Sequence, residues 1–340
     1  MFFNTARMVQ PEPGFIVGPI SGVLGFVLDF IFNIMSALSM PLALGLSIIV
    51  FTIVIRIILL PLAIKMHKNM EKMRTLKPAM DKINAKYAGK KDPDSTRQKN
   101  MEIQAMYKES GANPLSGCLP LLVQMPIFIT LFSMFQRPYM YISQLGDVYS
   151  RIAQQVMMVP GYDTIIAATH SIGLDKLPQN IQLYLGFGIE SELMRLFNTY
   201  TPTDWDTLLY VMPNINYDYM VYLLAQKDIM EHFLTISLVA PAGILLPGVA
   251  LPIISALSTF LTSKLMIRQQ QNMGGDQSAM AIQQKIILYV MPVMMGAITI
   301  TAPAGVGLYW VANNFFQLFQ HMALVKIAAK KEAEKEEKKE

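Results

Sequence analysis

Long stretches without a charged residue constrain the fold of this 340-residue chain more than any other feature. They cover residues 30–57, where Arg56 is the only exception, and residues 110–136, 232–263 and 286–325. Hydrophobic residues make up 53% of the chain and charged residues 15%, and the mean hydropathy is +0.36. This composition excludes an ordinary soluble protein. We therefore predict an all-α polytopic membrane protein.

The apolar stretches predict five transmembrane helices. As a helix, residues 286–325 would be about 60 Å long, twice the hydrocarbon thickness of a bilayer, and residues 301–305 (TAPAG) provide a turn at their middle. The expected organisation is an extracytoplasmic segment 1–41, a span 42–64, a cytoplasmic helical hairpin 65–115, a span 116–136, a long extracytoplasmic loop or small cap 137–242, a span 243–263, a cytoplasmic loop 264–285, spans 286–301 and 304–323, and a charged cytoplasmic tail 324–340.

The distribution of basic residues predicts the orientation in the membrane. Residues 65–115 contain twelve Lys and Arg against six acids, whereas residues 137–235 contain five against ten. Because loops rich in Lys and Arg stay in the cytoplasm, the N-terminus is expected outside the cell and the C-terminus inside. The tail 326–340 balances six Lys with five Glu, so it lacks the strongly basic character of a ribosome-docking tail.

The first 40 residues do not form a standard signal peptide, because Asp29 interrupts the apolar run before a small-residue cleavage site. Small and polar residues recur there at helical spacing, at Gly18, Gly22, Gly25, Asp29, Asn33 and Ser36, and the opposite face is apolar. This pattern predicts an amphipathic helix on the outer membrane surface. A sixth span is the alternative.

Residues 66–112 are predicted to form the two helices of the cytoplasmic hairpin. Methionines recur at helical spacing in the first helix, and Ser95 with Gln98 resembles a capping box that would start the second, which ends near Gly111. The methionines offer a soft surface for apolar clients or simply join the two helices. The basic face of the hairpin could also anchor it to anionic lipid headgroups.

Polar residues are concentrated within the predicted spans. Polar side chains in a bilayer usually face the interior of a bundle, although hydroxyls and amides also serve as interhelical hydrogen bonds without another role. Trp310, Asn314 and Gln317 share one helical face, and Thr52 lies one turn before Arg56. The candidate site residues are Arg56, Thr52, Gln124, Ser258, Thr259, Trp310, Asn313, Asn314 and Gln317.

Arg56 is the most unusual of these residues. It lies nine residues before Lys65, about 13 Å from the cytoplasmic end of its helix, which exceeds the comfortable reach of an arginine that snorkels to headgroups. No acid lies within the five predicted spans. An arginine without a fixed counter-ion is expected to hold water in a cavity and to attract an anionic guest.

Several segments of the sequence resemble the YidC/Oxa/Alb membrane insertases, in particular their Gram-positive type. These are residues 45–65 (GLSIIVFTIVIRIILLPLAIK), 76–80 (LKPAM), 106–108 (MYK), 111–115 (GANPL), 303–314 (PAGVGLYWVANN) and above all 117–128 (GCLPLLVQMPIF). The similarity is strong over residues 42–136 and moderate over residues 243–325. The loop 137–235 departs from it, because it is far longer than the short turn of the Gram-positive type.

The resemblance implies five spans around a hydrophilic groove that is open to the cytoplasm and to lipid. Arg56 would attract acidic residues in the tails of small membrane proteins, and Gln124, Trp310 and the asparagines would line the groove. The hairpin would receive clients. The implied partners are nascent membrane proteins, the lipid bilayer, the Sec translocon and the ribosome, with no specific nucleic acid, in the bacterial cell membrane.

The expected function is that of a membrane protein insertase and assembly chaperone, which is not an enzyme. The sequence contains no Walker-type glycine loop, nucleophile elbow or zinc motif, and its single cysteine, Cys118, excludes an internal disulfide. We expect no cofactor and no metal. A secondary transporter in which Arg56 binds an anionic solute is the alternative, although no internal repeat is evident. A purely structural assembly chaperone is a further possibility.

Overall fold

The computed structural model describes residues 17–90, 92–113, 119–169, 189–270, 282 and 284–337. The described part is mostly helical, which confirms the helical class. Cys118 and the first part of the 117–128 motif lie outside it. In chain order the elements are α1 (Val17–Leu38), η2 (Met40–Leu42), α2 (Ala43–Ile58), α3 (Leu60–Thr75), α4 (Lys77–Lys86), α5 (Pro93–Ser110), α6 (Leu119–Gln136), η4 (Pro138–Met140), α7 (Ser143–Met157), α8 (Tyr162–Thr169), α9 (Ile189–Phe197), α10 (Pro202–Val211), α11 (Tyr217–Glu231), β1 (His232–Phe233), β2 (Ile236–Ser237), α12 (Ala250–Gln270), η8 (Ile286–Val290), α14 (Met291–Thr301) and α15 (Ala304–Glu337).

Among the described residues, three helices are long and apolar enough to cross a membrane: Gly18–Leu38, Met40–Ile58 and Ala250–Ile267. Two shorter apolar helices cover Leu122–Gln136 and Ile286–Thr301. The helix Gly18–Leu38 is the segment for which a sixth span is the alternative to a surface helix. The expected last span, 304–323, forms the first part of α15, where four amide side chains lower the hydropathy. The number of spans therefore stays a prediction.

The chain divides into two compact units. The first unit comprises Met1–Ile48 and Thr130–Ala240, and the second comprises Ile49–Ile129 and Pro241–Glu340. The boundaries fall within α2 and within α6, so both helices contribute to both units.

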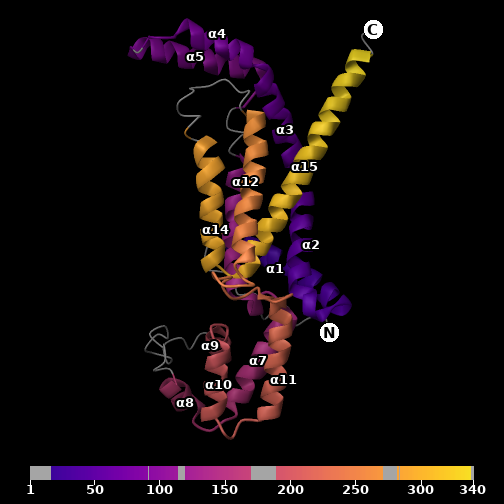
Figure 1. The fold of residues 1–340 in the computed structure, drawn as a ribbon, viewed down its shortest axis with the longest axis vertical. Helices are drawn as coiled ribbons and strands as arrows, with labels where there is room; N and C mark the ends of the chain where they lie inside the picture. The colour runs from indigo at the N-terminus through magenta and orange to yellow at the C-terminus, as the bar shows by residue number, and fades with distance from the viewer. Residues whose placement is uncertain are drawn as a thin grey trace. The chain divides into compact units, whose positions relative to one another are not determined.

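Short helices build most of the first unit, with α7 packed against α9, α11 and η4 (Figure 1). One face of α7 is buried and includes Leu145, Tyr149 and Ile152, because apolar side chains recur there every three to four residues. A second apolar centre joins the rings of Phe197 and Trp205, whose centroids are 5.0 Å apart. The strands β1 and β2 form a two-residue antiparallel pair that follows α11.

The polar stripe of α1 faces the start of α7 within the same unit. The carboxylate of Asp29 accepts hydrogen bonds from the backbone nitrogen of Ser143 at 2.7 Å and from its hydroxyl at 2.8 Å. A Cβ atom at Gly25 would lie 2.7 Å from the ring of Tyr141, so a larger residue here would force this ring or α1 to shift. On the other side of α1, the side chains of Phe26 and Phe30 are exposed. The stripe thus attaches α1 to the helices that follow α6 in this unit.

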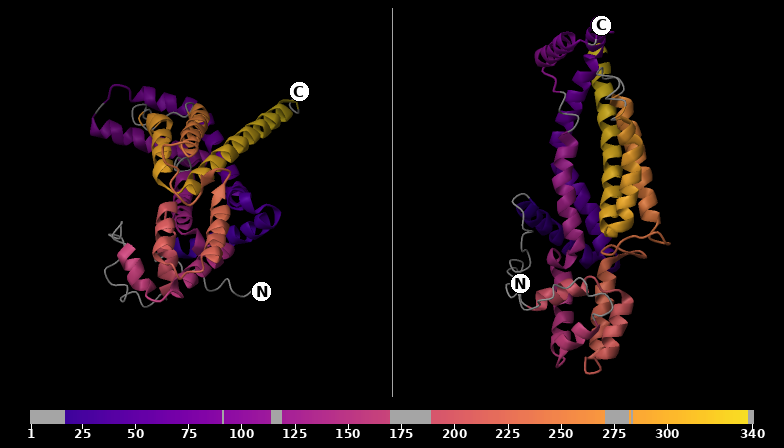
Figure 2. Two further views of the ribbon diagram at one scale, coloured as in Figure 1. Left: turned by 60° about the horizontal axis from the view of Figure 1, so that its bottom comes forward. Right: turned by 90° about the vertical axis from the view of Figure 1, so that its left-hand side faces the viewer.

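In the second unit, α12 packs along α14 and α15, and Figures 1 and 2 show these helices side by side. Small residues allow this close packing, as they do between many transmembrane helices. A Cβ atom at Gly296 would lie 3.3 Å from that of Ala256, and one at Gly307 would overlap the side chain of Thr299. Before α12, residues 241–249 are not helical, so this helix begins later than the predicted span 243–263.

The segment α3 to α5 lies between α2 and α6, where the sequence predicts a helical hairpin between the spans 42–64 and 116–136. Its second helix begins earlier than expected, and the predicted capping box at Ser95 is wrong. Asp92 is the N-cap, and its carboxylate accepts a hydrogen bond from the backbone nitrogen of Ser95 at 2.8 Å. Pro93 favours this start because proline has the backbone φ angle of a first helical residue. The helix ends at Gly111, whose φ of 62° is left-handed.

Candidate functional site

Arg56 lies on α2 in the second unit, where two neutral amides from other helices contact its guanidinium. Its Nε donates to Asn313 Oδ1 on α15 at 2.5 Å, and one terminal nitrogen donates to Gln124 Oε1 on α6 at 3.3 Å. These two partners are far from Arg56 in the sequence. The structure therefore brings together three residues that the sequence selects separately as candidates.

The hydrogen bonds continue from Gln124 into the centre of the same unit. Its Nε2 donates to the hydroxyl of Tyr309 on α15 at 2.7 Å, and Tyr309 is buried. Sequence analysis did not select this tyrosine, although it directly precedes Trp310 in the 303–314 motif. A tyrosine in an apolar helix has a hydroxyl that needs a partner, and this property could have identified it.

A second polar group of this unit joins α12 and α15. The indole nitrogen of Trp310 donates to Thr259 Oγ1 at 2.8 Å. The side-chain amide of Asn314 lies 3.0 Å from the hydroxyls of both Ser258 and Thr259. The ring of Phe128 on α6 meets Trp310 edge to face, with centroids 5.6 Å apart. Four of the predicted residues are thus in direct contact.

Successive residues of α15 serve these two polar groups. Asn313 contacts Arg56, whereas Asn314 contacts α12, because neighbouring side chains on an α-helix point about 100° apart. Thr52, one turn before Arg56, is fully buried. Gln317, one turn after Asn313, is half-buried and takes part in none of these contacts. The structure thus connects most, but not all, of the predicted residues.

The charge of Arg56 is not matched by an acid within the described part of the chain. The ion pairs recorded there join other residues, and both described partners of Arg56 are neutral amides. Amides satisfy hydrogen bonds without neutralising charge, and a charged side chain at the middle of a membrane helix costs about 3 kcal/mol. The arrangement can therefore accept a carboxylate from another molecule.

The described part of the chain offers no comparable site for a metal ion. Among the residues that the structure describes, no group of three or more His, Cys, Asp or Glu side chains could hold a metal ion. The polar side chains of these two groups are amides, hydroxyls, an indole and a phenol, besides the guanidinium of Arg56. They are suited to hydrogen bonding.

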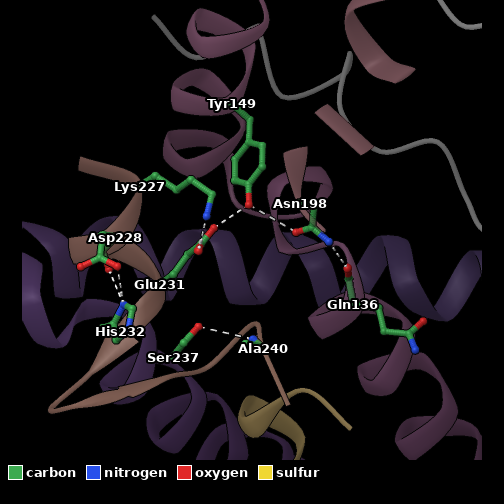
Figure 3. Close-up of polar contacts among 9 residues, drawn as sticks. All are labelled: Gln136, Tyr149, Asn198, Lys227, Asp228, Glu231, His232, Ser237 and Ala240. Carbon is green, nitrogen blue, oxygen red and sulfur yellow. Dashed lines mark hydrogen bonds and ion pairs between the residues drawn. The ribbon is translucent and has the colours of Figure 1, made fainter. Parts of the chain in front are cut away.

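The first unit contains a separate buried polar cluster that sequence analysis did not identify (Figure 3). The hydroxyl of Tyr149 donates to Glu231 at 2.6 Å, and Lys227 forms an ion pair with the same carboxylate at 2.8 Å. Burial and the charge of Glu231 raise the pKa of Tyr149 well above its ordinary value. Asn198 donates to the carbonyl oxygen of Gln136 at 2.8 Å. The cluster joins α7 to α11 and stabilises the fold of this unit.

Comparison with known proteins identifies relatives over most of the chain. The family described as "60Kd inner membrane protein" matches residues 35–332. A protein of Clostridium perfringens named membrane protein insertase YidC is 28% identical over 279 residues, which cover 82% of this chain and 77% of that protein.

Two further bacterial relatives give the same result. A membrane protein insertase YidC of Oceanobacillus iheyensis is 27% identical over 268 residues, covering 79% of this chain and 69% of the relative. The protein named membrane protein insertase YidC 1 of Lactococcus lactis is 27% identical over 278 residues, covering 81% and 66%. Together with its apolar helices, these relatives identify the chain as a bacterial membrane protein. Because the family match extends from residue 35 to residue 332, this chain belongs to the family of the 60Kd inner membrane protein.

Proposed function

We propose that this protein is a membrane protein insertase and assembly chaperone. It moves short hydrophilic tails of small membrane proteins across the bilayer and releases their hydrophobic segments into lipid. The observation that carries this proposal is Arg56, a cation in an apolar helix whose described partners are the neutral amides of Asn313 and Gln124. The relatives named membrane protein insertase support the same function.

The magnitude of the electrostatic terms supports a transient ion pair. Two opposite unit charges about 4 Å apart attract by about 4 kcal/mol at an effective dielectric constant of 20. This is similar to the cost of about 3 kcal/mol for one charge at the centre of a membrane helix. A client carboxylate beside Arg56 would therefore offset much of the cost of both charges, and the pair would be weak enough to separate afterwards.

The polar side chains of α6, α12 and α15 are the proposed lining of a hydrophilic groove among five spans. Gln124, Ser258, Thr259 and the two asparagines offer donors and acceptors to a polar tail, which would otherwise lose its hydrogen bonds in hydrocarbon. Thr52 and Gln317 are further candidates for this lining. Mechanistically, no covalent step is required, since the groove shortens the apolar distance that the tail has to cross.

The other parts of the chain have proposed roles in the same process. The hairpin of α3 to α5 receives the nascent client on the cytoplasmic side, and the C-terminus lies on that side as well. The ribosome and the Sec translocon are proposed partners. Ribosome contact would rest on the basic residues of the cytoplasmic loops rather than on the balanced charges of the tail.

Reconstitution of the purified protein into liposomes tests the role of Arg56. The client is a small membrane protein with one aspartate in its outer tail, and protease protection of the tail measures insertion. We expect Arg56→Ala to lower the rate about tenfold or more, and Arg56→Lys to keep most of it, because the ion pair requires only a cation. Arg151→Ala is the matched control, since it removes an exposed arginine that lies outside the predicted spans.

A second client, with asparagine in place of the tail aspartate, separates charge attraction from a structural role. Insertion of this client should respond little to Arg56→Ala. Equal loss for both clients would refute the ion-pair mechanism. If no variant, including the unmodified protein, inserted either client while the liposomes took up an anion, the insertase proposal itself would fail.

A further inference from the structure

Three consecutive large aliphatic side chains are exposed in the segment directly before α12. Ile244, Leu245 and Leu246 are 70%, 78% and 83% exposed within this chain. They lie in the non-helical segment 241–249, and no Asp, Glu, Lys or Arg occurs between residues 232 and 263. In an aqueous environment, such a run would leave a large apolar area in contact with water.

The segment that carries these side chains has a defined conformation in the second unit. The backbone nitrogen of Gly243 donates to the carbonyl oxygen of Ile300 on α14 at 3.1 Å, and Pro241 pairs with Pro303 in an isolated β-bridge. The backbone nitrogen of Val249 donates to Leu245 at 2.9 Å, and a Cβ atom at Gly248 would overlap the carbonyl oxygen of Ala242. Exposure of the three side chains is thus a property of a folded loop.

The loop directly precedes a candidate membrane span, Ala250–Ile267, and therefore lies near one boundary of the membrane. Between Ala250, its first residue, and Lys264, the first charge that follows, the helix rises by about 21 Å. The hydrocarbon layer is about 30 Å thick, so a span must extend beyond this uncharged part, as the candidate span Ala250–Ile267 does when it includes Lys264. A short span is accommodated by thinning the bilayer or by burying the flanking residues. The apolar residues that flank α12 on this side are those of the loop.

The exposed apolar surface also continues from the loop along α12. Ile253 is 52% exposed and Leu257 is 63% exposed, and the window Ala250–Ile267 is only 39% buried within the chain. Residues of this kind in a membrane helix face lipid acyl chains. The loop side chains that adjoin them are therefore expected to contact lipid acyl chains as well.

We propose that residues 244–246 form a lipid-binding loop that inserts into the leaflet at the N-terminal end of α12. Its partner is the boundary between headgroups and acyl chains, where the backbone groups without internal partners still reach water or headgroups. Few backbone N–H groups of this loop would lose a partner in the membrane. Pro241 and Pro247 have no N–H group, and the nitrogens of Gly243 and Val249 already donate hydrogen bonds within the protein. This lowers the free-energy cost of placing the loop in the leaflet. The inference rests on the membrane location of the chain and is independent of the proposed insertase activity.

Nitroxide accessibility in proteoliposomes tests this inference. In a Cys118→Ser background, a spin label is attached to Leu245→Cys, to Leu257→Cys as the lipid reference, and to Tyr210→Cys, whose side chain is 87% exposed in the first unit, as the water reference. Oxygen collects in the bilayer, whereas a nickel chelate stays in water. We expect oxygen to relax the label at 245 more than the chelate does, as at 257, and the opposite order at 210.

Two results would overturn the proposal. One is a label at 245 that prefers the chelate to the same extent as the label at 210, which would place the loop in water. The other is a label that neither reagent reaches, which would mean that a protein segment covers the loop. Labels at Ile244→Cys and Leu246→Cys provide independent readings, so that a local distortion at one position does not decide the outcome.

Discussion

At the scale of residues, two partly buried cations of the described chain, Arg56 and Lys227, have partners of different kinds. Lys227 forms an ion pair with Glu231 at 2.8 Å, and their side chains are only 12% and 4% exposed. Arg56 instead donates to two neutral amides among the described residues. A buried cation that serves stability is normally paired with a carboxylate. The contrast within one chain agrees with the proposal that the partner of Arg56 is supplied by a client.

The cluster around Glu231 leads to a prediction on stability (Figure 3). Tyr149→Phe removes the hydroxyl that donates to Glu231 at 2.6 Å in a fully buried position. We expect the free energy of unfolding of the first unit to fall by about 1 to 3 kcal/mol, because the buried carboxylate loses one donor. Chemical denaturation followed by near-ultraviolet circular dichroism measures this loss. Tyr210→Phe, at an exposed position, should change the stability little.

The pKa of Tyr149 sets the pH dependence of the same interaction. Burial raises the pKa of this phenol well above its ordinary value of 10, so the folded state retains its proton more tightly than the unfolded state. The stabilisation is complete below pH 10 and decreases as the pH rises above it. Denaturation curves between pH 9 and about pH 12 should show a smaller decrease for Tyr149→Phe than for the unmodified protein. Identical slopes would contradict this assignment.

At the scale of elements, α15 is the helix around which the second unit is organised. It contributes Tyr309, Trp310 and both asparagines to the polar contacts, and it packs against α12 through its N-terminal part. Gly307 makes this close approach possible, since a side chain there would overlap Thr299 of α14 and meet Leu251 of α12. The positions of the polar side chains thus depend on a glycine that carries no chemistry.

Gly307→Ala tests this dependence. Alanine favours a helix by about 1 kcal/mol over glycine, so a purely local effect would stabilise the protein. We expect destabilisation by about 1 to 3 kcal/mol instead, because the added methyl group forces α15 away from its neighbours. Thermal unfolding in detergent measures the difference. The control is Gly22→Ala in α1, where a Cβ atom would meet nothing within 4 Å and where stability should be unchanged or slightly higher.

At the scale of the whole molecule, the distribution of charges predicts on which side of the membrane each polar segment lies. The segment 65–115, with its excess of basic residues, is expected in the cytoplasm, and the acidic segment 137–235 is expected outside. In the proposed function this topology would orient the groove, because a client that arrives from the cytoplasm would meet the hairpin of α3 to α5 first. The function and the orientation can be tested separately.

Cysteine labelling in intact cells tests the orientation. In the Cys118→Ser background, a maleimide that does not cross membranes should label Tyr210→Cys at once and Met101→Cys only after lysis, since both side chains are exposed in their units. Labelling after lysis provides the total for each position. The opposite order of labelling would reverse the topology and would exclude the hairpin as the site that receives nascent clients.

The sequence identifies most, but not all, of the separate members of the candidate site. Arg56, Gln124 and Asn313 are conspicuous because each is polar within an apolar stretch. It did not reveal which of them touch, since 257 positions separate Arg56 from Asn313. Tyr309 was missed because its ring suits an apolar helix. The cluster of Tyr149 and Glu231 was missed because such residues are ordinary in a water-exposed segment.

Local rules also had limits at helix ends. Ser95 and Gln98 satisfy the pattern of a capping box, but the helix begins at Pro93 with Asp92 as its cap. Similarly, the apolar run before Lys264 suggested one continuous span, whereas α12 begins only at Ala250. A proline stands near both boundaries, Pro93 as the first residue of α5 and Pro247 three residues before α12, and hydropathy carries no information on backbone conformation.

By itself, the sequence determined that this protein lies in a membrane, that it is helical and to which family it belongs. Those properties follow from hydropathy, charge and motifs, each of which depends on residues that are close together in the chain. Only the tertiary structure decided that Arg56 donates hydrogen bonds to Asn313 and Gln124 and that Gly307 allows α15 to pack closely against its neighbours. It also decided that the side chains of residues 244–246 are exposed on a folded loop. These features depend on the rotation and depth of each helix, which are set by packing between segments distant in sequence.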